Sequence, residues 1–290
     1  MTSAVVTGSG RPRGLPAGAW VVPPVAVLAV LFLYPLGLIV GQALSDDRGL
    51  TLANFVRVFR SAAFASAFLH TVEIAVAASA ICLVLGFVLA LILSFVAFPG
   101  SSLIARLIET YIALPTFLVA LAFTFLYGSA GILNESLMAA FRLALPPLDF
   151  LYSPAGVILA EVTVYTPFVM RPLLAAFGLI DRAQIEVASS LGGRPFQIVR
   201  EIILPAALPA LLAGGSLCLL LTVNEFGIVL FIGAKGVITL PLLVYDKAIQ
   251  EFDYPTACAI AAVNVVLSLS LYSVYRVLLS SAGARRAGLV

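Results

Sequence analysis

Carboxyl groups interrupt several of the long apolar stretches of this 290-residue chain. A charge at the centre of a lipid bilayer costs roughly 2.5–3.5 kcal/mol on insertion scales, so such residues usually face a bundle interior, a partner or a water-filled path. Glu73 and Glu109 stand near the ends of apolar stretches, from which a side chain can reach the polar interface. Glu161 and Glu225 stand further inside and are the candidates for a path through an apolar phase.

Glu161 lies about a turn and a half into its apolar stretch. Two interpretations stay open for it, a place on the path or a hydrogen bond between helices. Its polar sequence neighbours are Thr163, Tyr165 and Thr166.

Glu225 belongs to the run Asn224-Glu225-Phe226-Gly227. We expect Asn224 and Glu225 to line the path. The alternative is a structural carboxyl group that is protonated or paired inside a helix bundle, with Thr222 as the nearest candidate partner.

Catalytic and metal-binding constellations are missing from the sequence. The single histidine, His70, has no nucleophile or second ligand near it, and none of the cysteines, Cys82, Cys218 and Cys258, has metal-type spacing. No GxxxxGK[ST] run that would cradle a nucleotide occurs. The sequence therefore predicts a chain that is not an enzyme and that holds no metal and no cofactor of its own.

The composition indicates whether water or lipid surrounds the chain. It is 62% hydrophobic and 10% charged, whereas soluble domains are about a quarter charged. The mean hydropathy is +1.14. Too few charges are present to cover a water-facing surface, so the outside must face lipid, and a formal net charge of +2 gives no reason to expect a nucleic-acid partner.

Six stretches have the roughly 20 apolar residues that a spanning helix requires. Backbone groups cannot stay unpaired in lipid, and the stretches are too long for barrel strands, so they must be helices. Small residues at 75–80 and 210–216 permit close helix packing. The expected fold is an all-α polytopic membrane bundle with spans at Trp20–Gln42, Thr71–Val96, Leu107–Tyr127, Gly156–Gly178, Ala206–Phe231 and Thr256–Leu279.

The basic residues predict the orientation, because cytoplasmic loops are enriched in Lys and Arg. With the N-terminus in the cytoplasm, ten of the 16 basic residues fall on the cytoplasmic side and six outside. Both termini are therefore expected inside. The expected organisation is a cytoplasmic tail at 1–19, a transmembrane domain at 20–279 with a cytoplasmic loop at 179–205, and a cytoplasmic tail at 280–290.

The loop at 179–205 has clear local signals. Asp181 suits the N-cap of a short helix, the glycines at 192 and 193 suit its left-handed end, and Pro195 suits the first turn of the next helix. Pro205 and Pro209 follow where the chain returns into the membrane. The pattern predicts a short amphipathic helix, a sharp turn, and a second helix that leads into the fifth span.

This loop resembles the EAA loop of ABC importer permeases, in which Glu-Ala-Ala is followed after three residues by Gly and after nine more by Ile-x-Leu-Pro. Val187 replaces the first Ala and is the one departure. The matching residues are Glu186, Ala188, Gly192, Ile202, Leu204 and Pro205.

The resemblance implies a type I ABC importer permease in the bacterial inner membrane. Its partners would be ABC ATPase subunits, a second permease subunit that is the same or a related chain, and a periplasmic substrate-binding protein. The loop would enter a groove of the ATPase, where Glu186 would meet polar or basic groups and Gly192 would permit the turn. ATP and Mg²⁺ would be bound and hydrolysed by that separate chain.

The substrate is indicated by further resemblances. A similar Glu-Phe-Gly stretch occurs in permeases of the sulfate, molybdate, iron and phosphonate branch, and the sequence after Glu225 resembles permeases for 2-aminoethylphosphonate. Sulfate, ferric iron, thiamine and polyamines remain open as substrates. The alternative outside this class is a secondary transporter driven by an ion gradient, although the sequence has no convincing internal repeat of the kind typical of such folds.

Overall fold

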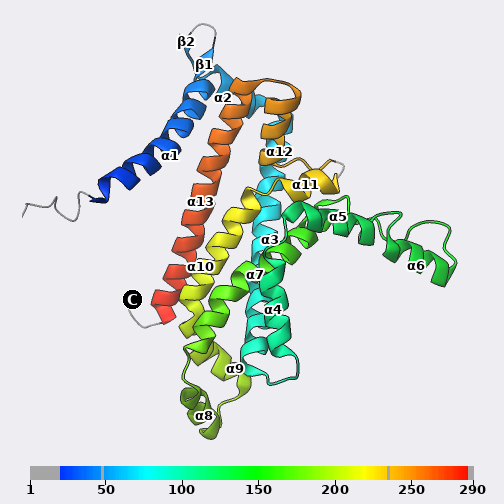
Figure 1. The fold of residues 1–290 in the computed structure, drawn as a ribbon, viewed down its shortest axis with the longest axis vertical. Coiled ribbons are helices and arrows are strands. Elements are labelled where there is room, and N and C mark those ends of the chain that lie inside the picture. Colours follow the sequence, from blue (N-terminus) through cyan, green and yellow to red (C-terminus); the bar gives the residue numbers. More distant parts are fainter. Residues whose placement is uncertain (1–19, 47–48, 234–235, 287–290) are drawn as a thin grey trace, which may run out of the picture.

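The computed structural model describes residues 20–46, 49–233 and 236–286. The predicted N-terminal tail, 1–19, lies outside them, as do residues 287–290 of the predicted C-terminal tail. In chain order the elements are α1 (Val22–Ala43), β1 (Ser45–Asp46), β2 (Gly49–Leu50), α2 (Ala53–Arg60), α3 (Ala62–Phe95), α4 (Ser101–Tyr111), α5 (Thr116–Tyr127), α6 (Ile132–Phe141), α7 (Pro154–Gly178), α8 (Arg182–Ser190), α9 (Pro195–Ile198), η2 (Val199–Ile203), α10 (Leu204–Val223), α11 (Gly227–Ile232), α12 (Leu240–Tyr245), η3 (Asp246–Gln250) and α13 (Tyr254–Arg286) (Figure 1).

The predicted all-α membrane bundle is confirmed. Within the described residues, six helical stretches are long and apolar enough to cross a membrane. The only strands there are β1 and β2, which form a short antiparallel hairpin that pairs Ser45 with Leu50. The helix of the sixth span, α13, continues to Arg286, beyond the predicted end of the span at Leu279.

The third predicted span, Leu107–Tyr127, is wrong in its bounds. The helix breaks after Tyr111 and restarts at Thr116, and the apolar stretch long enough to span is Thr116–Phe141. Pro115 causes the break, since its ring disfavours helical geometry at the preceding residue, and Pro115 itself is extended with ψ 137°.

The fifth predicted span, Ala206–Phe231, is also broken. Its helix begins earlier, because α9, η2 and α10 follow one another without interruption from Pro195 to Val223. It ends at Asn224, and α11 then starts at Gly227. Glu225 therefore lies in a helix break rather than inside a helix.

The centre of the bundle is made by α3, α7 and α10, which pack on one another. Val169 of α7 is fully buried between two glycines, one on each neighbouring helix. A Cβ atom at Gly86 of α3 would lie 3.0 Å from Cβ of Val169, and one at Gly214 of α10 would lie 3.0 Å from its Cα. The predicted close approach at small residues is thus confirmed for α10.

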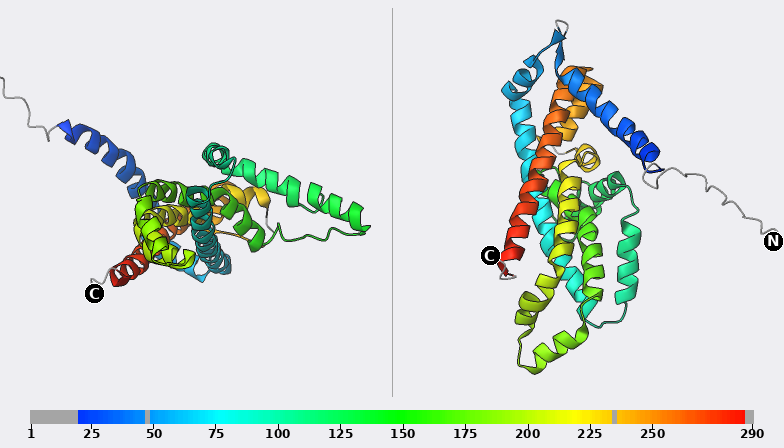
Figure 2. Two further views of the ribbon diagram at one scale, coloured as in Figure 1. Left: turned by 90° about the horizontal axis from the view of Figure 1, so that it is seen from below. Right: turned by 90° about the vertical axis from the view of Figure 1, so that its left-hand side faces the viewer.

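Two parts extend away from this centre. Helix α1 touches α13 near the hairpin and then diverges from the bundle (Figures 1 and 2), so that Ala43 is its only buried residue. Helices α5 and α6 form an arm on the other side. The buried Asn134 fastens α6, because its amide donates to the carbonyl oxygens of Gly128 at 2.9 Å and Leu148 at 2.8 Å.

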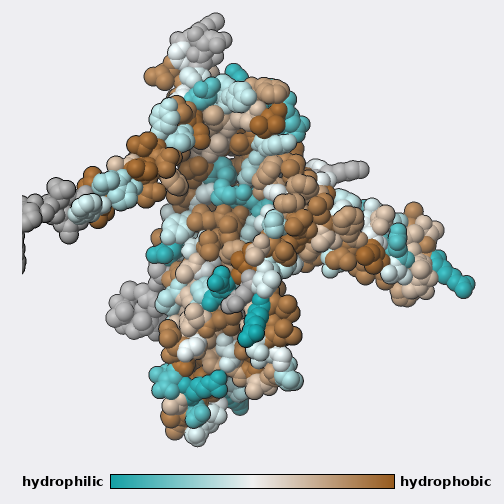
Figure 3. All heavy atoms as spheres, viewed as in Figure 1, coloured by the Kyte–Doolittle hydropathy of each residue, from teal (hydrophilic) through white to brown (hydrophobic). Residues whose placement is uncertain are grey.

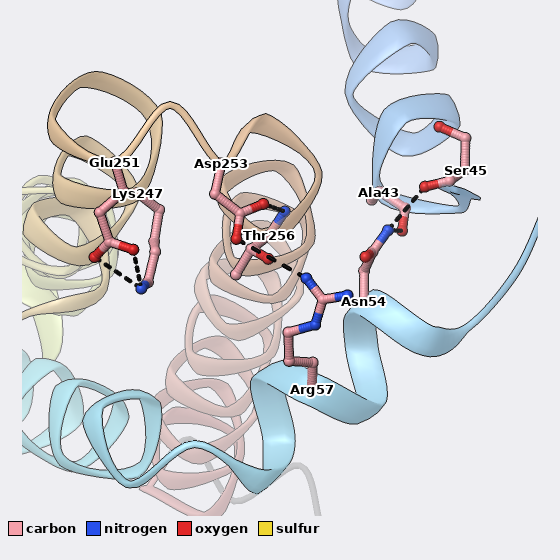
Figure 4. Close-up of polar contacts among 8 residues, drawn as sticks. All are labelled: Ala43, Ser45, Asn54, Arg57, Lys247, Glu251, Asp253 and Thr256. Atoms are coloured by element: carbon pink, nitrogen blue, oxygen red, sulfur yellow. Dashed lines mark hydrogen bonds and ion pairs between the residues drawn. The ribbon is translucent and has the colours of Figure 1, made fainter. Parts of the chain in front are cut away.

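The distribution of polar residues fits a chain surrounded by lipid. Apolar residues cover much of the face in Figure 3, and hydrophilic residues gather at the end of the molecule formed by α8 and α9. At the opposite end a second polar group joins α1, α2 and α13 (Figure 4). There Asn54 of α2 donates to the carbonyl oxygens of Ala43 at 3.1 Å and Ser45 at 3.0 Å.

Candidate functional site

The loop between α7 and α10 has the local structure that its sequence predicts. The Asp181 side chain accepts a hydrogen bond from the backbone N–H of Ala183 at 3.0 Å and so caps α8. Gly192 has φ +85°, a left-handed conformation that side chains with a Cβ rarely adopt. The N–H of Gly193 then bonds to the carbonyl oxygen of Ala188 at 2.9 Å and closes the turn.

The helix that leads back from the loop into the bundle, here called the return helix, runs from Pro195 to Val223 and contains a π-helical turn. Pro195 occupies the first position of α9, and η2 then inserts a wider turn at Val199–Ile203, directly before Leu204 and Pro205. Pro205 has no N–H to give to the preceding turn and its ring would collide with the carbonyl there. In a π turn each N–H bonds to a carbonyl oxygen five residues earlier instead of four. The wider turn therefore makes room for the proline ring that follows it.

A groove of about 410 Å³ lies between α8 and the return helix. It is lined by Ala188, Leu191, Gly192, Gly193, Gln197, Ile198, Glu201 and Ile202. Leu191 in its wall is 84% exposed, and Phe196, which follows Pro195, is 74% exposed. Helix α8 has no buried residue. This end of the molecule therefore presents apolar side chains on a hydrophilic loop, a combination that marks interaction surfaces.

The predicted loop residues divide into two groups. Ala188, Gly192 and Ile202 line the groove, and the Glu186 side chain is exposed on α8. Leu204 is partly buried and Pro205 is exposed at the start of α10. The groove thus brings three of the six predicted residues together.

A second cavity, of about 310 Å³, lies between α4, α5, α7 and α10 and is partly open, since Leu114 and Asn224 in its wall are exposed. The break after α4 contributes Ile112 and Leu114, and the break after α10 contributes Asn224 and Glu225, so both helix breaks open on the same space. The remaining lining residues are Tyr111, Thr116, Val119, Val164, Tyr165, Phe168, Leu220 and Leu221. Non-helical backbone is tolerated at membrane depth where it is buried in protein or lines a cavity.

Glu225 is held by three elements. The Tyr165 hydroxyl of α7 donates to its Oε2, the Ile228 N–H of α11 donates to Oε1 at 2.8 Å, and the Thr116 hydroxyl of α5 reaches Oε1 at 3.5 Å. The carboxyl group accordingly caps the start of α11 while it remains in the cavity wall. The alternative pairing of Glu225 with Thr222 is wrong, because the Thr222 hydroxyl lies 3.2 Å from the hydroxyl of Ser79 instead.

Asn224 joins the cavity to α13. Its amide donates to Ser268 at 3.3 Å, and its carbonyl oxygen accepts from Asn264 at 3.0 Å. The two residues predicted for the path from the run at 224–227 therefore both line the cavity and both contact other helices.

Glu161 is not part of the cavity wall. It is 1% exposed, and its Oε2 has no hydrogen-bond partner within the described part of the chain. Of its predicted companions, Thr163 and Thr166 donate to backbone carbonyl oxygens of their own helix, and Tyr165 bonds to Glu225. The side chain of Glu109 lies outside what the structure describes, and that of Glu73 is exposed.

The sequence interpretation missed the hydroxyl groups of the cavity. Tyr111 and Thr116 flank the break at Pro115, but the sequence predicts one continuous span there, and it indicates Tyr165 as a neighbour of Glu161 rather than of Glu225. The proline inside an apolar stretch is the signal that could have located the break, and with it the residues beside it.

Comparisons with known proteins agree with this architecture. Residues 82–282 match the family described as the binding-protein-dependent transport system inner membrane component. PhnU of Salmonella typhimurium, whose name assigns it to a 2-aminoethylphosphonate transport system as a permease protein, is 60% identical over 267 residues, which cover 92% of this chain and 93% of PhnU. The sulfate transport system permease protein CysT of Escherichia coli is 31% identical over 265 residues, 90% of this chain and 91% of CysT.

The fold also matches solved structures. A chain of a bacterial ABC transporter involved in the import of the polysaccharide alginate superposes with a TM-score of 0.74 at 18% identity, over 92% of this chain and 94% of that chain. At that identity the likeness shows the fold, which is that of ABC importer permeases. The chain belongs to the family of inner membrane components of binding-protein-dependent transport systems and is a multi-pass permease.

Proposed function

We propose that this permease carries 2-aminoethylphosphonate from the periplasm to the cytoplasm as part of an ATP-driven importer. The observation that carries the substrate assignment is the 60% identity with PhnU over 92% of the chain, against 31% with the sulfate permease CysT. Sulfate is the rival substrate, since CysT belongs to the same group of relatives.

The energy would come from a separate ATPase that docks on the loop between α7 and α10. Support comes from the groove of about 410 Å³, from the exposed side chains of Leu191 in its wall and Phe196 on α9, and from the EAA-like spacing of Glu186 and Gly192. Burying these apolar side chains in a partner would favour docking. ATP and Mg²⁺ would be held by that partner, and this chain would need no cofactor of its own.

The orientation follows from the same loop. If the ATPase lies in the cytoplasm, then α8 and α9 form the cytoplasmic end and the β1–β2 hairpin the periplasmic end. The N-terminal end of α1 and the C-terminal end of α13 both point away from the hairpin (Figure 1), which supports cytoplasmic termini. A periplasmic binding protein would deliver substrate to the hairpin end, beside a second permease subunit that is a copy or a related chain.

The path would pass the cavity that contains Asn224 and Glu225. Glu161 lies outside its wall and would act from within the bundle. Because Glu225 touches α5, α7 and α11 together, any rearrangement of these helices changes the cavity.

Uptake of radiolabelled 2-aminoethylphosphonate by cells that express the complete system tests this proposal. We expect uptake that is abolished by depletion of ATP and that a tenfold excess of sulfate does not inhibit. Inhibition by sulfate to background would transfer the assignment to sulfate. Uptake that persists without ATP and collapses with the ion gradient would favour a secondary transporter.

The docking assignment has its own test. Glu186→Lys reverses the charge of an exposed side chain on α8, and Glu135→Lys makes the same change on the exposed face of α6, far from the loop. We expect Glu186→Lys to lose the co-purifying ATPase and substrate uptake, and Glu135→Lys to keep both. Retention of the ATPase by the Glu186 variant at the level of the control would contradict docking at α8.

A further inference from the structure

The residues that line the cavity at the two helix breaks indicate which charge it favours. Among the described residues that line it, those with ionisable side chains are Tyr111, Tyr165 and Glu225. All three are acids, and Lys, Arg and His are missing from this lining. A cation is therefore favoured near Glu225, whereas an anion finds only neutral donors.

Glu225 keeps room for one more donor. A carboxyl group offers about four lone-pair positions, of which the Tyr165 hydroxyl and the Ile228 N–H occupy two. The Thr116 contact is long, at 3.5 Å, and lies at the limit of a hydrogen bond. A charged ammonium group is a stronger donor than a hydroxyl at that distance, so it would take the position that Thr116 only approaches.

Tyr111 supplies the complementary feature. Its hydroxyl is buried in the wall and has no hydrogen-bond partner within the described part of the chain. Leaving a buried hydroxyl unpaired costs free energy that a partner would recover. An acceptor oxygen of a solute that reaches this hydroxyl from the cavity would be that partner.

The size of the cavity limits the solute. Ligand pockets in proteins measure about 300–1,000 Å³, and this cavity, at about 310 Å³, lies at the lower end of that range. It is large enough for a small solute and too small to enclose an oligosaccharide, although the fold is shared with an importer of alginate.

We propose that this cavity is a binding site for a small zwitterion on its way through the permease, with the ammonium group at Glu225 and Thr116 and an anionic oxygen at the hydroxyl of Tyr111. The inference rests on the proposed function, since 2-aminoethylphosphonate carries one ammonium group and one phosphonate group. It adds a site in the permease itself that recognises the ammonium group of the solute.

Binding to the purified permease–ATPase complex in lipid nanodiscs, without the periplasmic binding protein, tests the site. Isothermal titration with 2-aminoethylphosphonate is compared with ethylphosphonate, which has the same anionic end and no ammonium group. We expect ethylphosphonate to bind about tenfold more weakly or worse, as the loss of one charge-assisted hydrogen bond implies. Equal binding of the two compounds would overturn the proposal.

Two substitutions separate a ligand contact from a structural role. Tyr111→Phe removes only an unpaired hydroxyl, so a structural role predicts unchanged or better stability, whereas the proposal predicts about tenfold weaker binding. Glu225→Gln keeps an acceptor for the Ile228 N–H and should weaken binding of 2-aminoethylphosphonate while leaving ethylphosphonate unaffected. The matched controls, Tyr272→Phe and Glu73→Gln, lie outside the cavity wall and should bind as the wild type does.

Cellular uptake distinguishes failure of the site from failure of the proposed function. If wild-type cells import 2-aminoethylphosphonate but the purified complex binds it no better than the Tyr111→Phe variant does, the site is wrong and the transport assignment stands. If wild-type cells import sulfate and no 2-aminoethylphosphonate, both are wrong. Binding that weakens in Tyr111→Phe and Glu225→Gln, with normal controls, supports the site.

Discussion

The hydroxyl of Tyr165, in the middle of α7, donates a hydrogen bond to Oε2 of Glu225, in the break between α10 and α11. Both residues are buried. The contact joins the fourth and fifth spans at the point where the fifth span stops being helical, and it fixes one oxygen of the carboxyl group against the cavity wall.

Tyr165→Phe should therefore destabilise the bundle. The substitution leaves a buried carboxyl oxygen without its donor, which costs about 1–3 kcal/mol. Tyr275→Phe is the matched control, since the hydroxyl of Tyr275 donates to a neutral acceptor, the backbone carbonyl oxygen of Leu211, at 2.7 Å. Thermal unfolding in detergent should show the larger loss for Tyr165→Phe, and an equal or larger loss for Tyr275→Phe would contradict the role given to the contact.

Gly192→Ala should impair transport while the bundle stays folded. The left-handed backbone at Gly192, with φ +85°, costs an L-residue roughly 1–2 kcal/mol, and the turn lies outside the packed spans. Gly178→Ala is the control, because a Cβ at Gly178 meets no atom within 4 Å and its φ is ordinary. Uptake and thermal unfolding are measured together. A Gly192→Ala variant with normal uptake would show that the turn tolerates a side chain.

Gly214→Val should loosen the packing of α10 on α7. A Cβ at Gly214 would already lie 2.9 Å from Cγ of Pro172 and 3.0 Å from Cα of Val169, and overpacking of this kind costs about 1–3 kcal/mol. Gly41→Val on α1 is the control, because a Cβ there has open space. The melting temperature should fall only for Gly214→Val, and an unchanged melting temperature would mean that α7 and α10 can move apart freely.

The polar group at the hairpin end gives two substitutions of unequal effect (Figure 4). Asn54→Asp removes the donor that binds the carbonyl oxygens of Ala43 and Ser45 and places acceptors opposite acceptors, which should cost about 1–3 kcal/mol. Arg57→Ala breaks an ion pair with Asp253 at 4.0 Å, but the arginine side chain is 60% exposed, so about 0–1 kcal/mol is expected. Proteolysis of the α1–α2 connection should accelerate for Asn54→Asp alone, and equal rates would reverse this ranking.

The local turn chemistry of the α7–α10 loop was predictable because it depends on neighbouring residues. Asp181, Gly192 and Pro195 each act within one or two turns of helix, so the cap, the left-handed turn and the new start could be assigned from residue type alone. The six apolar stretches were predictable for a similar reason, since length and hydropathy are enough to define them.

The helix breaks were not predictable in the same way. The spans are apolar on all sides, so periodicity does not indicate which face is buried or where a helix stops. Pro115 gave a local signal, but the end of α10 at Asn224 depends on tertiary contacts with Asn264 and Ser268 of α13, which lie 40 and 44 residues away. Glu225 stands out in the sequence as a carboxyl group in an apolar segment, while its partners Tyr165 and Thr116 come from two other helices and could not be inferred from its neighbours.

The uninterrupted run from Pro195 to Val223 also has a mechanical meaning. Its 29 residues make a rod of about 43 Å at the usual helical rise. One end carries the groove beside Gly192, and the other ends directly before Asn224 and Glu225. A continuous helix can work as a lever, so a push on the loop end would reach the cavity wall without a relay of side chains. The π turn at Val199–Ile203 is then the place where such a lever would bend. Its stiffness would determine how much of a displacement at the loop reaches the cavity.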